Sequence, residues 1–345
     1  MTGRKNDLPD GDVSELYRSY EDASIESLGD FHKVSGQLYD LMNKVSDGAD
    51  GARRRFAFRG AVNASWPLHS SLFRRLSWKG SGPVSEAQLR TTEREIMTNV
   101  HRWGLHRVSN RLSIMEQLAM LQHYGAPTRL IDITFDAYVA LWFAVERDEF
   151  DANGRPVDGR FFAFDVTNRL INDDDRFRSW EHSLQTPWAL EPATGPAKPA
   201  TGPAKAEYNA AVGIEPAEWI SRVWAWEPPN LEARISAQQG AFLFGGVPDS
   251  TITPRWRKPD GGYWGVNDVR RSTSVALRFH HLIRDRGFRS ADAAYTLRVS
   301  GKSKGCLRDE LLAVFGYSHG RMFPDFPGFR DYGTPDLPTR PPAVP

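Results

Sequence analysis

Hydrophobic and polar positions change their spacing twice between residues 113 and 146. Helical spacing comes first: Ser113 and Glu116 form a capping-box pattern that predicts the start of a helix, and Gly125 predicts its end. A short run of alternating polar and hydrophobic residues then predicts a strand. Thr134 is the expected N-cap of a second helix, whose hydrophobic stripe is rich in alanine. We therefore expect a helix, a strand and a helix in succession, with the second helix packed closely on a sheet.

The same two periodicities predict elements along most of the chain. Helices are expected over residues 25–45, 86–102, 231–239 and 303–315, and strands over residues 53–60, 159–166, 219–226, 241–244, 275–279 and 294–300. This mixture predicts an α+β fold, in which a curved, mostly antiparallel sheet is flanked by helices.

A single domain is expected between two poorly ordered ends. Residues 1–24 are polar and predict a disordered N-terminal arm, and residues 333–345 are rich in proline and predict a flexible tail. Residues 25–332 form the expected domain. Within it, residues 192–205 consist of the heptamer PATGPAK repeated once. Because this composition cannot bury a core, we expect a mobile insertion there and not a domain boundary.

The composition is that of an ordinary globular protein. Of the 345 residues, 40% are hydrophobic and 25% are charged, and the net charge of +1 favours neither a nucleic acid nor a membrane as partner. Cys306 is the single cysteine, which excludes an internal disulfide; we expect it to be a small buried side chain. The sequence has no apolar run that could span a bilayer and no secretory start, so a cytoplasmic location without a membrane partner is expected.

Polar residues cluster around the strand expected between residues 113 and 146. Asp132 lies between two isoleucines, where a carboxylate must be paired or hydrogen-bonded. Gln122, His123 and Tyr124 end the preceding helix just before a tight turn, a position typical of a pocket rim. Two interpretations stay open: Asp132 acts in a functional site, or it is a structural latch to an arginine.

Arg59 is the second candidate for a functional charge. It ends an expected strand, lies on the opposite face from two phenylalanines, and is followed by Gly60. A guanidinium there can bind a carboxylate or a phosphate through two hydrogen bonds. Together with Trp66, Arg74 and Arg75, this pattern suits a nucleotide or a single strand of nucleic acid. The alternative is a surface arginine within a run of charges.

These residues belong to motifs that resemble the FRG domain family, which is named after Phe-Arg-Gly. The matching motifs are Phe58–Gly60 and residues 122–132 (QHYGAPTRLID), 140–144 (ALWFA), 234–242 (RISAQQGAF) and 323–325 (FPD). The resemblance extends over roughly residues 30–332 and leaves out the repeated heptamer. It implies that one FRG domain accounts for nearly all of the ordered chain.

A looser similarity, to ADP-ribosyltransferases, concerns the reaction. Such enzymes break the bond between nicotinamide and ribose in NAD, which requires a cation to hold NAD and a carboxylate to stabilise the developing charge. The similarity implies that Arg59 holds the dinucleotide, that Tyr124 stacks on it and that Thr134 supplies a hydroxyl. It also places Gln239 where the catalytic glutamate is expected. Because glutamine is neither an anion nor a base, Asp132 is our candidate for the carboxylate.

The remaining candidates for binding NAD are polar or charged residues of the same motifs: His123, Arg129, Arg234 and Gln238. NAD is the expected substrate, and no metal is expected. If the site is real, residues distant in sequence converge on one cleft: Arg59, Gln122, His123, Arg129, Asp132, Arg234 and Gln239.

Two functions follow as hypotheses. The first is an NAD-using transferase that modifies a nucleic acid or a protein, as a toxin or a defence effector. The second is a non-catalytic module that binds a nucleotide or single-stranded nucleic acid through Arg55, Arg59, Arg74 and Arg75. The structural alternative is that Arg59 and Asp132 only stabilise the fold.

Overall fold

The computed structural model describes residues 14–22, 24–43, 54–80, 83–108, 110–173, 186, 188, 216–229, 232–258, 261–282 and 293–335. The repeated heptamer at residues 192–205 lies outside this described part. So does the proline-rich tail after residue 335.

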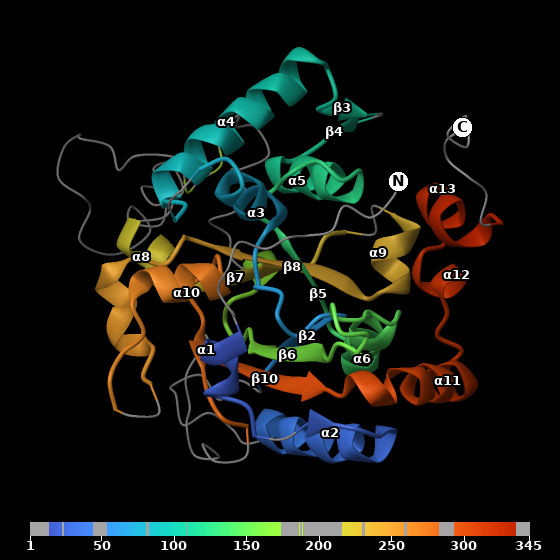
Figure 1. The fold of residues 1–345 in the computed structure, drawn as a ribbon. Coiled ribbons are helices and arrows are strands. Elements are labelled where there is room, and N and C mark those ends of the chain that lie inside the picture. Colours follow the sequence, from blue (N-terminus) through green and yellow to red (C-terminus); the bar gives the residue numbers. More distant parts are fainter. Residues whose placement is uncertain are drawn as a thin grey trace, which may run out of the picture.

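The described residues form a mixed α+β fold around an open, mostly antiparallel sheet (Figure 1), as predicted. The strand order is β1 (Ser24–Ile25), β10 (Ala293–Val299), β6 (Gly159–Asp165), β2 (Phe56–Ala61), β5 (Ile131–Thr134), β8 (Gly240–Gly245) and β7 (Val223–Trp226), and β9 (Arg278–Phe279) also pairs with β10. Only β1 and β9 pair with β10 in parallel; the other pairs within this described sheet are antiparallel. A separate two-stranded sheet contains β3 (Arg107–Val108) and β4 (Asn110–Arg111).

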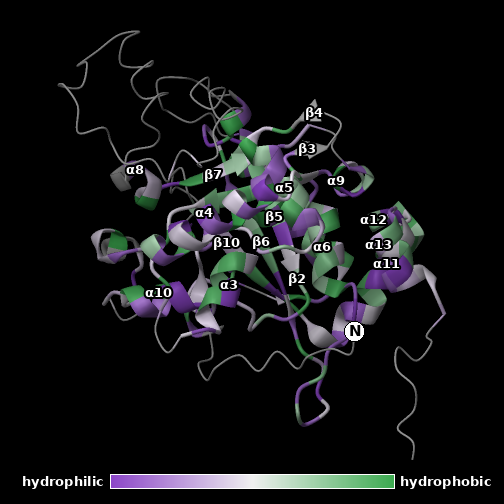
Figure 2. Cartoon of the chain, turned by 90° about the horizontal axis from the view of Figure 1, so that it is seen from above, coloured by the Kyte–Doolittle hydropathy of each residue, from purple (hydrophilic) through white to green (hydrophobic). Residues whose placement is uncertain are grey.

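One face of the sheet is covered by α2 (Leu28–Asn43), α6 (Ala137–Val145) and α11 (Lys304–Phe315). Phe56 and Phe58 of β2 point to these helices, because alternate residues of a strand share a face. In Figure 2, α6 is largely hydrophobic, whereas α11 also carries hydrophilic residues. α6 is therefore the buried helix of this layer, with an apolar surface all round.

The opposite face packs against α1 (Ser14–Arg18) and α10 (Val266–Ser272), with Phe162 and Phe164 of β6 in the contact. Beside β7 and β8, a third cluster joins the sheet to α4 (Glu86–Arg102) and α5 (Ile114–His123). α3 (Ser71–Ser77) packs on α4, and Figure 1 shows these three helices together at one end of the molecule.

The remaining described elements are short. They are α8 (Pro216–Ser221), α9 (Ala233–Ala237), α12 (His319–Met322), α13 (Phe326–Gly328), the 3-10 helices Ile171–Asp173, Ser250–Arg255 and Gly301–Ser303, and the π-helix Phe329–Gly333. In Figure 1, α9, α12 and α13 lie at the same side of the molecule. α12 and α13 belong to the last part of the described chain, and the contact of α12 with α9 brings that part beside the ends of β5 and β8.

Two glycines allow α6 to lie directly on the sheet. A Cβ atom at Gly60 would lie 1.9 Å from the carbonyl oxygen of Ala140, and one at Gly159 would lie 2.3 Å from that of Ala144. Because no side chain fits in either place, the glycine of the Phe-Arg-Gly motif is required by close packing. The alanines on the facing side of α6 serve the same contact, as the sequence predicted.

The capping boxes predicted at Ser113 and Ser85 are present. The cap expected at Thr134 is wrong: Asp136 caps α6, and its Oδ1 accepts hydrogen bonds from the N–H groups of Tyr138 (2.7 Å) and Val139 (3.2 Å). The hydroxyl of Thr134 instead accepts from the N–H of Asp136 at 3.0 Å. Because α6 begins at Ala137, directly after Asp136, the side chain of Asp136 and not that of Thr134 reaches the free N–H groups of the first turn.

Other expected elements differ from the structure. Residues 14–18 of the expected disordered arm form α1, and Tyr17 is buried, where its hydroxyl donates a hydrogen bond to the carbonyl of Ser272. Residue 219, expected in a strand, lies in α8. Cys306 is exposed on α11, so its expected burial is wrong. Each of these differences depends on contacts with segments far away in the sequence, which local periodicity does not contain.

Candidate functional site

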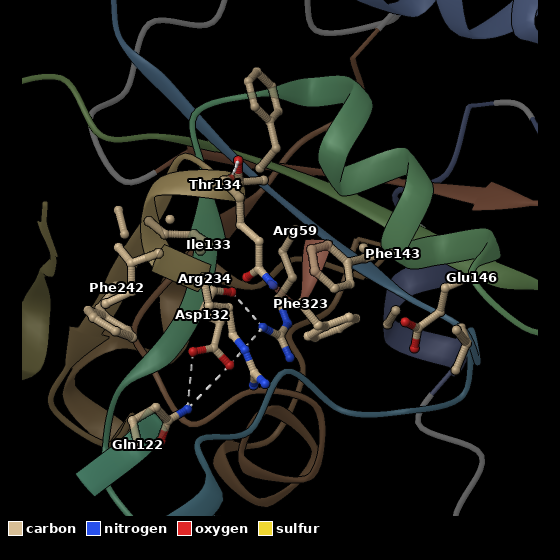
Figure 3. A pocket seen from close by; sticks show the side chains of 18 of the residues that line it. Arg59, Gln122, Asp132, Ile133, Thr134, Phe143, Glu146, Arg234, Phe242 and Phe323 are labelled. Carbon is tan, nitrogen blue, oxygen red and sulfur yellow. Dashed lines mark hydrogen bonds and ion pairs between the residues drawn. The ribbon is translucent and has the colours of Figure 1, made fainter. Parts of the chain in front are cut away.

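A cavity of about 320 Å³ opens where β2, β5 and β8 meet the ends of α5 and α6 (Figure 3). We call it the cleft. It is lined by Phe58, Arg59, Gly60, Ala61, Val62, Trp66, Gln122, His123, Asp132, Ile133, Thr134, Phe143, Glu146, Arg147, Arg234, Ile235, Gln238, Gly240, Ala241, Phe242 and Phe323. Its volume lies near the lower end of the range of about 300–1,000 Å³ that is typical of small-molecule pockets. The cleft is thus large enough for a nucleoside-sized group.

Arg59 and Asp132 lie together in the cleft. The Nη1 atom of Arg59 donates to the backbone carbonyl of Asp132 and lies 3.9 Å from its Oδ2 atom. The side chain of Asp132 is 61% exposed, so its carboxylate is accessible to a ligand. In Figure 3 the two side chains converge from β2 and β5. Their neighbours in the sheet therefore fix the relative position of a cation and an anion.

Gln122 orients this carboxylate. Its Nε2 atom lies 3.3 Å from both carboxylate oxygens of Asp132. Its Oε1 atom accepts hydrogen bonds from the hydroxyls of Thr128 (2.7 Å) and Ser71 (3.3 Å). Because these two donors occupy the oxygen, the amino group of Gln122 must face Asp132. Gln122 therefore fixes the position of the Asp132 carboxylate, which still faces solvent.

Positive charge predominates at the edge of the cleft next to Arg59. Burial lowers the pKa of Arg59, and the charge of Asp132 opposes this shift. The pKa of Arg74 is lowered by burial and then by the charges of Arg59 and Arg75. Arg75 also donates a hydrogen bond to the carbonyl of Gly125 at 2.9 Å. The repulsion between these guanidinium groups favours binding of an anion such as a phosphate at this edge.

The wall opposite β2 depends on an ion pair between α9 and the last part of the described chain. Arg234 binds Asp325 through two contacts, Nε–Oδ2 at 2.7 Å and Nη2–Oδ1 at 2.8 Å. Its guanidinium also lies 4.9 Å from the ring centre of Phe323. Burial would raise the pKa of Asp325, but hydrogen bonds from Arg234 and Gly328 hold it below its usual range. Arg234 is thus used for structure as well as for lining the cleft.

His123 and Gln238 line the cleft from its two sides. The Nε2 atom of His123 lies 3.9 Å from Oδ2 of Asp325. Gln238 donates from Nε2 to the carbonyl of Met322 at 2.8 Å, and its own carbonyl accepts from the hydroxyl of Thr134 at 2.6 Å. The hydroxyl of Thr134 is therefore occupied, although the residue lies in the cleft as predicted.

Arg129 lies elsewhere, so its predicted place in the cleft is wrong. Its side chain is 1% exposed, and its Nε atom binds both oxygens of Glu93, at 2.8 and 3.0 Å. Its Nη1 atom lies 3.3 Å from Glu86, and the rings of Trp188 and Trp219 lie 5.0 and 5.1 Å from the guanidinium. Arg129 is a buried structural arginine.

Tyr124 and Gln239 also lie outside the cleft. Tyr124 is 68% exposed, because it follows the last turn of α5 and points into solvent. Gln239 is exposed and has a φ of 45°, a left-handed conformation that turns the chain into β8 and directs Gln238 to the cleft instead. The position expected of a catalytic glutamate therefore does not face the cleft.

Glu146 is a lining residue that the sequence analysis missed. It follows the last residue of α6, its side chain is 10% exposed, and burial raises the pKa of its carboxyl group. Phe143 and Phe323 form the neighbouring aromatic wall, with ring centres 6.0 Å apart. In the sequence, a glutamate next to an arginine at a helix end is too common a pattern to indicate a site residue. The one available signal was that Glu146 closes an otherwise apolar helix.

Two further findings concern metals and membranes. No group of three or more histidine, cysteine, aspartate or glutamate side chains that could hold a metal ion occurs in the described part of the chain. Among the described helices, none combines the length and the apolar character needed to cross a bilayer.

The described sheet thus carries a cleft with polar side chains and an aromatic wall, at the place where β2, β5 and β8 meet. The model of the FRG domain family matches residues 54–153, so this segment is an FRG domain, as the motifs within it predicted; that the domain extends over residues 25–332 stays a prediction. The matched segment contains Arg59, Gln122, Asp132 and Glu146, whereas Arg234 comes from outside it. No curated protein and no solved structure matched the chain in these comparisons. They therefore give no support to the similarity to ADP-ribosyltransferases.

Proposed function

We propose that the cleft binds NAD and that the protein breaks the bond between its nicotinamide and its ribose, transferring ADP-ribose to an acceptor. The observation that carries this proposal is the pairing of Arg59 with a solvent-accessible Asp132 that Gln122 holds in place. A fixed cation next to a fixed, open carboxylate suits a substrate with phosphates at one end and a developing positive charge at the other.

The residues present fit such a substrate. Arg59, Arg74 and Arg75 offer guanidinium groups to the phosphates, and the aromatic wall of Phe143 and Phe323 offers a surface for a flat ring. Phosphate binding by arginine needs no metal. The cleft volume suits one half of a dinucleotide, which leaves the other half at the arginine-lined edge.

The carboxylate of Asp132 would stabilise the positive charge that develops in the transition state. When the bond between the ribose carbon and the nicotinamide nitrogen breaks, its electron pair leaves with nicotinamide, and the ribose carbon becomes positive. An anion held close to that carbon lowers the barrier. The acceptor, a hydroxyl, amine or carboxyl group of a nucleic acid or protein, or water, then bonds to the carbon. It releases its proton, if it carries one, to the solvent. Asp132 thus supplies the negative charge that the similarity assigns to the position of Gln239. Gln239 itself is uncharged and does not line the cleft.

Nicotinamide release from NAD is the direct test. We expect the protein to release nicotinamide, and we expect Asp132→Asn to slow release by about 100-fold or more, as with the loss of other charge-stabilising groups. Arg59→Ala should mainly weaken NAD binding. Arg271→Ala and Asp268→Asn are matched controls, because these two residues form an exposed ion pair on α10, outside the cleft. If the folded protein neither binds nor consumes NAD, the proposal fails.

A second candidate is a module that binds a nucleotide or single-stranded nucleic acid without turnover. It is favoured by the excess of arginine over carboxylate at the edge of the cleft. Arg55 is left out of the arginines proposed to bind the ligand, because its guanidinium pairs with Glu227 at 2.9 Å and stacks on the ring of Phe135. Calorimetry would separate the two functions: a pure binding module gives affinity that falls steeply with salt, and no product.

A further inference from the structure

Glu146 occupies the other end of the cleft from the Arg59–Asp132 pair. Figure 3 shows it beyond Phe143 and Phe323, apart from Asp132 and Gln122. It is the C-cap residue of α6, where the negative end of the helix dipole disfavours a carboxylate. The helix that packs on Gly60 therefore also places this carboxyl group, so the position is fixed by the core and not by a mobile loop.

One oxygen of Glu146 is left without a partner. Its Oε1 atom accepts a hydrogen bond from Nη1 of Arg147 at 2.7 Å. Its Oε2 atom is buried and has no hydrogen-bond partner among the described residues. Buried polar atoms are normally satisfied, because leaving one unpaired destabilises the fold. An unsatisfied oxygen in the lining of a cavity is a position at which a bound ligand supplies the missing partner.

Burial and two neighbouring charges act on this carboxyl group. Burial raises its pKa, the charge of Arg147 opposes the shift, and the charge of Glu149 adds to it. Aromatic residues line this end of the cleft. One is Trp66, whose ring centre lies 5.8 Å from the guanidinium of Arg147. On the other side, Phe323 stacks on Tyr332 at 4.9 Å. A flat ring is the ligand group that this end of the cleft would accept.

We propose that Glu146 binds a planar edge with a hydrogen-bond donor next to an acceptor, either the carboxamide of nicotinamide or the amino edge of adenine. This inference rests on the proposed function, since both groups belong to NAD. The Oε2 atom, which is buried in the cleft lining and has no partner among the described residues, can accept a hydrogen bond from the amino group of either edge. The edge would supply the partner that Oε2 lacks.

Paired ligands measure this recognition directly. Nicotinamide is compared with 3-acetylpyridine, which lacks the amino group, and AMP with purine riboside monophosphate, which lacks the amino group of adenine. Calorimetry on the full chain should show that one amino-bearing ligand binds about tenfold tighter than its analogue. The pair that shows the preference identifies which ring lies beside Glu146.

Three variants assign the preference to Glu146. Glu146→Leu removes the acceptor oxygens and should abolish the preference, whereas Glu146→Gln keeps one acceptor oxygen and should retain it. Asp268→Leu is the matched control, because Asp268 is a carboxylate on α10 that does not line the cleft. It should bind like the unchanged protein. Unfolding temperatures show whether each variant is folded.

The outcomes separate this inference from the proposed function. If the unchanged protein binds NAD but shows no preference within either pair, or if Glu146→Leu keeps the preference, the inference is overturned and the function stands. If the unchanged protein binds neither NAD nor any of the four probes, both are overturned. A preference that is lost only in Glu146→Leu supports the inference.

Discussion

Arg59 and Arg129 show how differently the fold uses two arginines. Arg129 is enclosed by two glutamates and two tryptophans, and little of it reaches solvent. Arg59 has one distant carboxylate partner and an open side facing the cleft. A buried ion pair costs much when one partner is removed, because the other charge is left without compensation. An open pair contributes little to stability.

Replacing these two arginines should therefore have opposite effects. Arg129→Met leaves Glu93 buried without its cation and should lower the free energy of unfolding by about 3–5 kcal/mol. Arg59→Ala should lower it by about 1 kcal/mol or less and should mainly affect ligand binding. Urea unfolding of both variants measures the difference. Equal losses of stability would mean that Arg59 is structural too.

Sequence reasoning could not distinguish the two in advance. Arg129 and Asp132 belong to the same motif, and both looked equally polar. The partners of Arg129 come from α4, α8 and residue 188, which only the folded chain brings together. One signal was available: Glu86 and Glu93 are seven residues apart, and thus on one face of the helix predicted from Ser85. This spacing is equally typical of a solvent-exposed helix face, so it could not by itself identify Arg129 as a buried cation.

At the scale of elements, the contact between α6 and the sheet controls the cleft. Both Arg59, one residue before Gly60, and Glu146, at the end of α6, are placed by it. This helix was predicted well, because its spacing and small residues are local properties of the sequence. The element boundaries that were wrong, such as Trp219 in a strand, depend on burial against distant segments.

A methyl group at Gly60 should disrupt this contact. Its Cβ would lie 1.9 Å from the oxygen of Ala140 and 2.5 Å from the nitrogen of Ala144, both of them backbone atoms that cannot move aside alone. Gly60→Ala should lower the free energy of unfolding by about 3 kcal/mol or more. Gly36→Ala is the control: nothing lies within 4 Å of the added atom, and alanine favours a helix interior by about 0.5–1 kcal/mol. If thermal unfolding shows similar effects for both variants, the contact is looser than described.

At the scale of the whole molecule, the cleft collects residues from segments far apart in sequence. Of the predicted set, the structure brings Arg59, Gln122, His123, Asp132 and Arg234 to its lining. These are polar residues at the ends of elements, and sequence can identify such positions. Phe143, Phe323 and Glu146 were missed because aromatic and charged residues of this kind are common on ordinary surfaces and cores. Only three-dimensional proximity distinguishes them.

The stability of the whole molecule should depend on pH through His69. Burial lowers its pKa to about 4 from an ordinary 6.5; a hydrogen bond to the carbonyl of Arg270 opposes this shift, and the charge of Arg74 adds to it. The unfolded chain therefore takes up this proton at a higher pH than the folded chain. The stabilising contribution is complete above pH 6.5 and is lost as the pH falls to about 4.

His69→Gln removes this titration. Between pH 6.5 and 4, the unfolding free energy of the unchanged protein should fall by an additional amount on the order of 2 kcal/mol compared with the variant. Urea unfolding at several pH values measures both curves, and their difference cancels the other titrating groups. Parallel curves would show that His69 is protonated as easily in the folded protein as in the unfolded chain.

The wall that contains Phe323 has a consequence for protein synthesis. Arg59, Asp132 and Glu146 leave the ribosome early, but Phe323 and Asp325, which complete the cleft and hold Arg234, emerge near the end of the described chain. A nascent chain thus exposes its charged residues long before it has an enclosed place for a ligand. Translation that stops before residue 323 would therefore yield a product that has the charged residues of the cleft but lacks one of its walls.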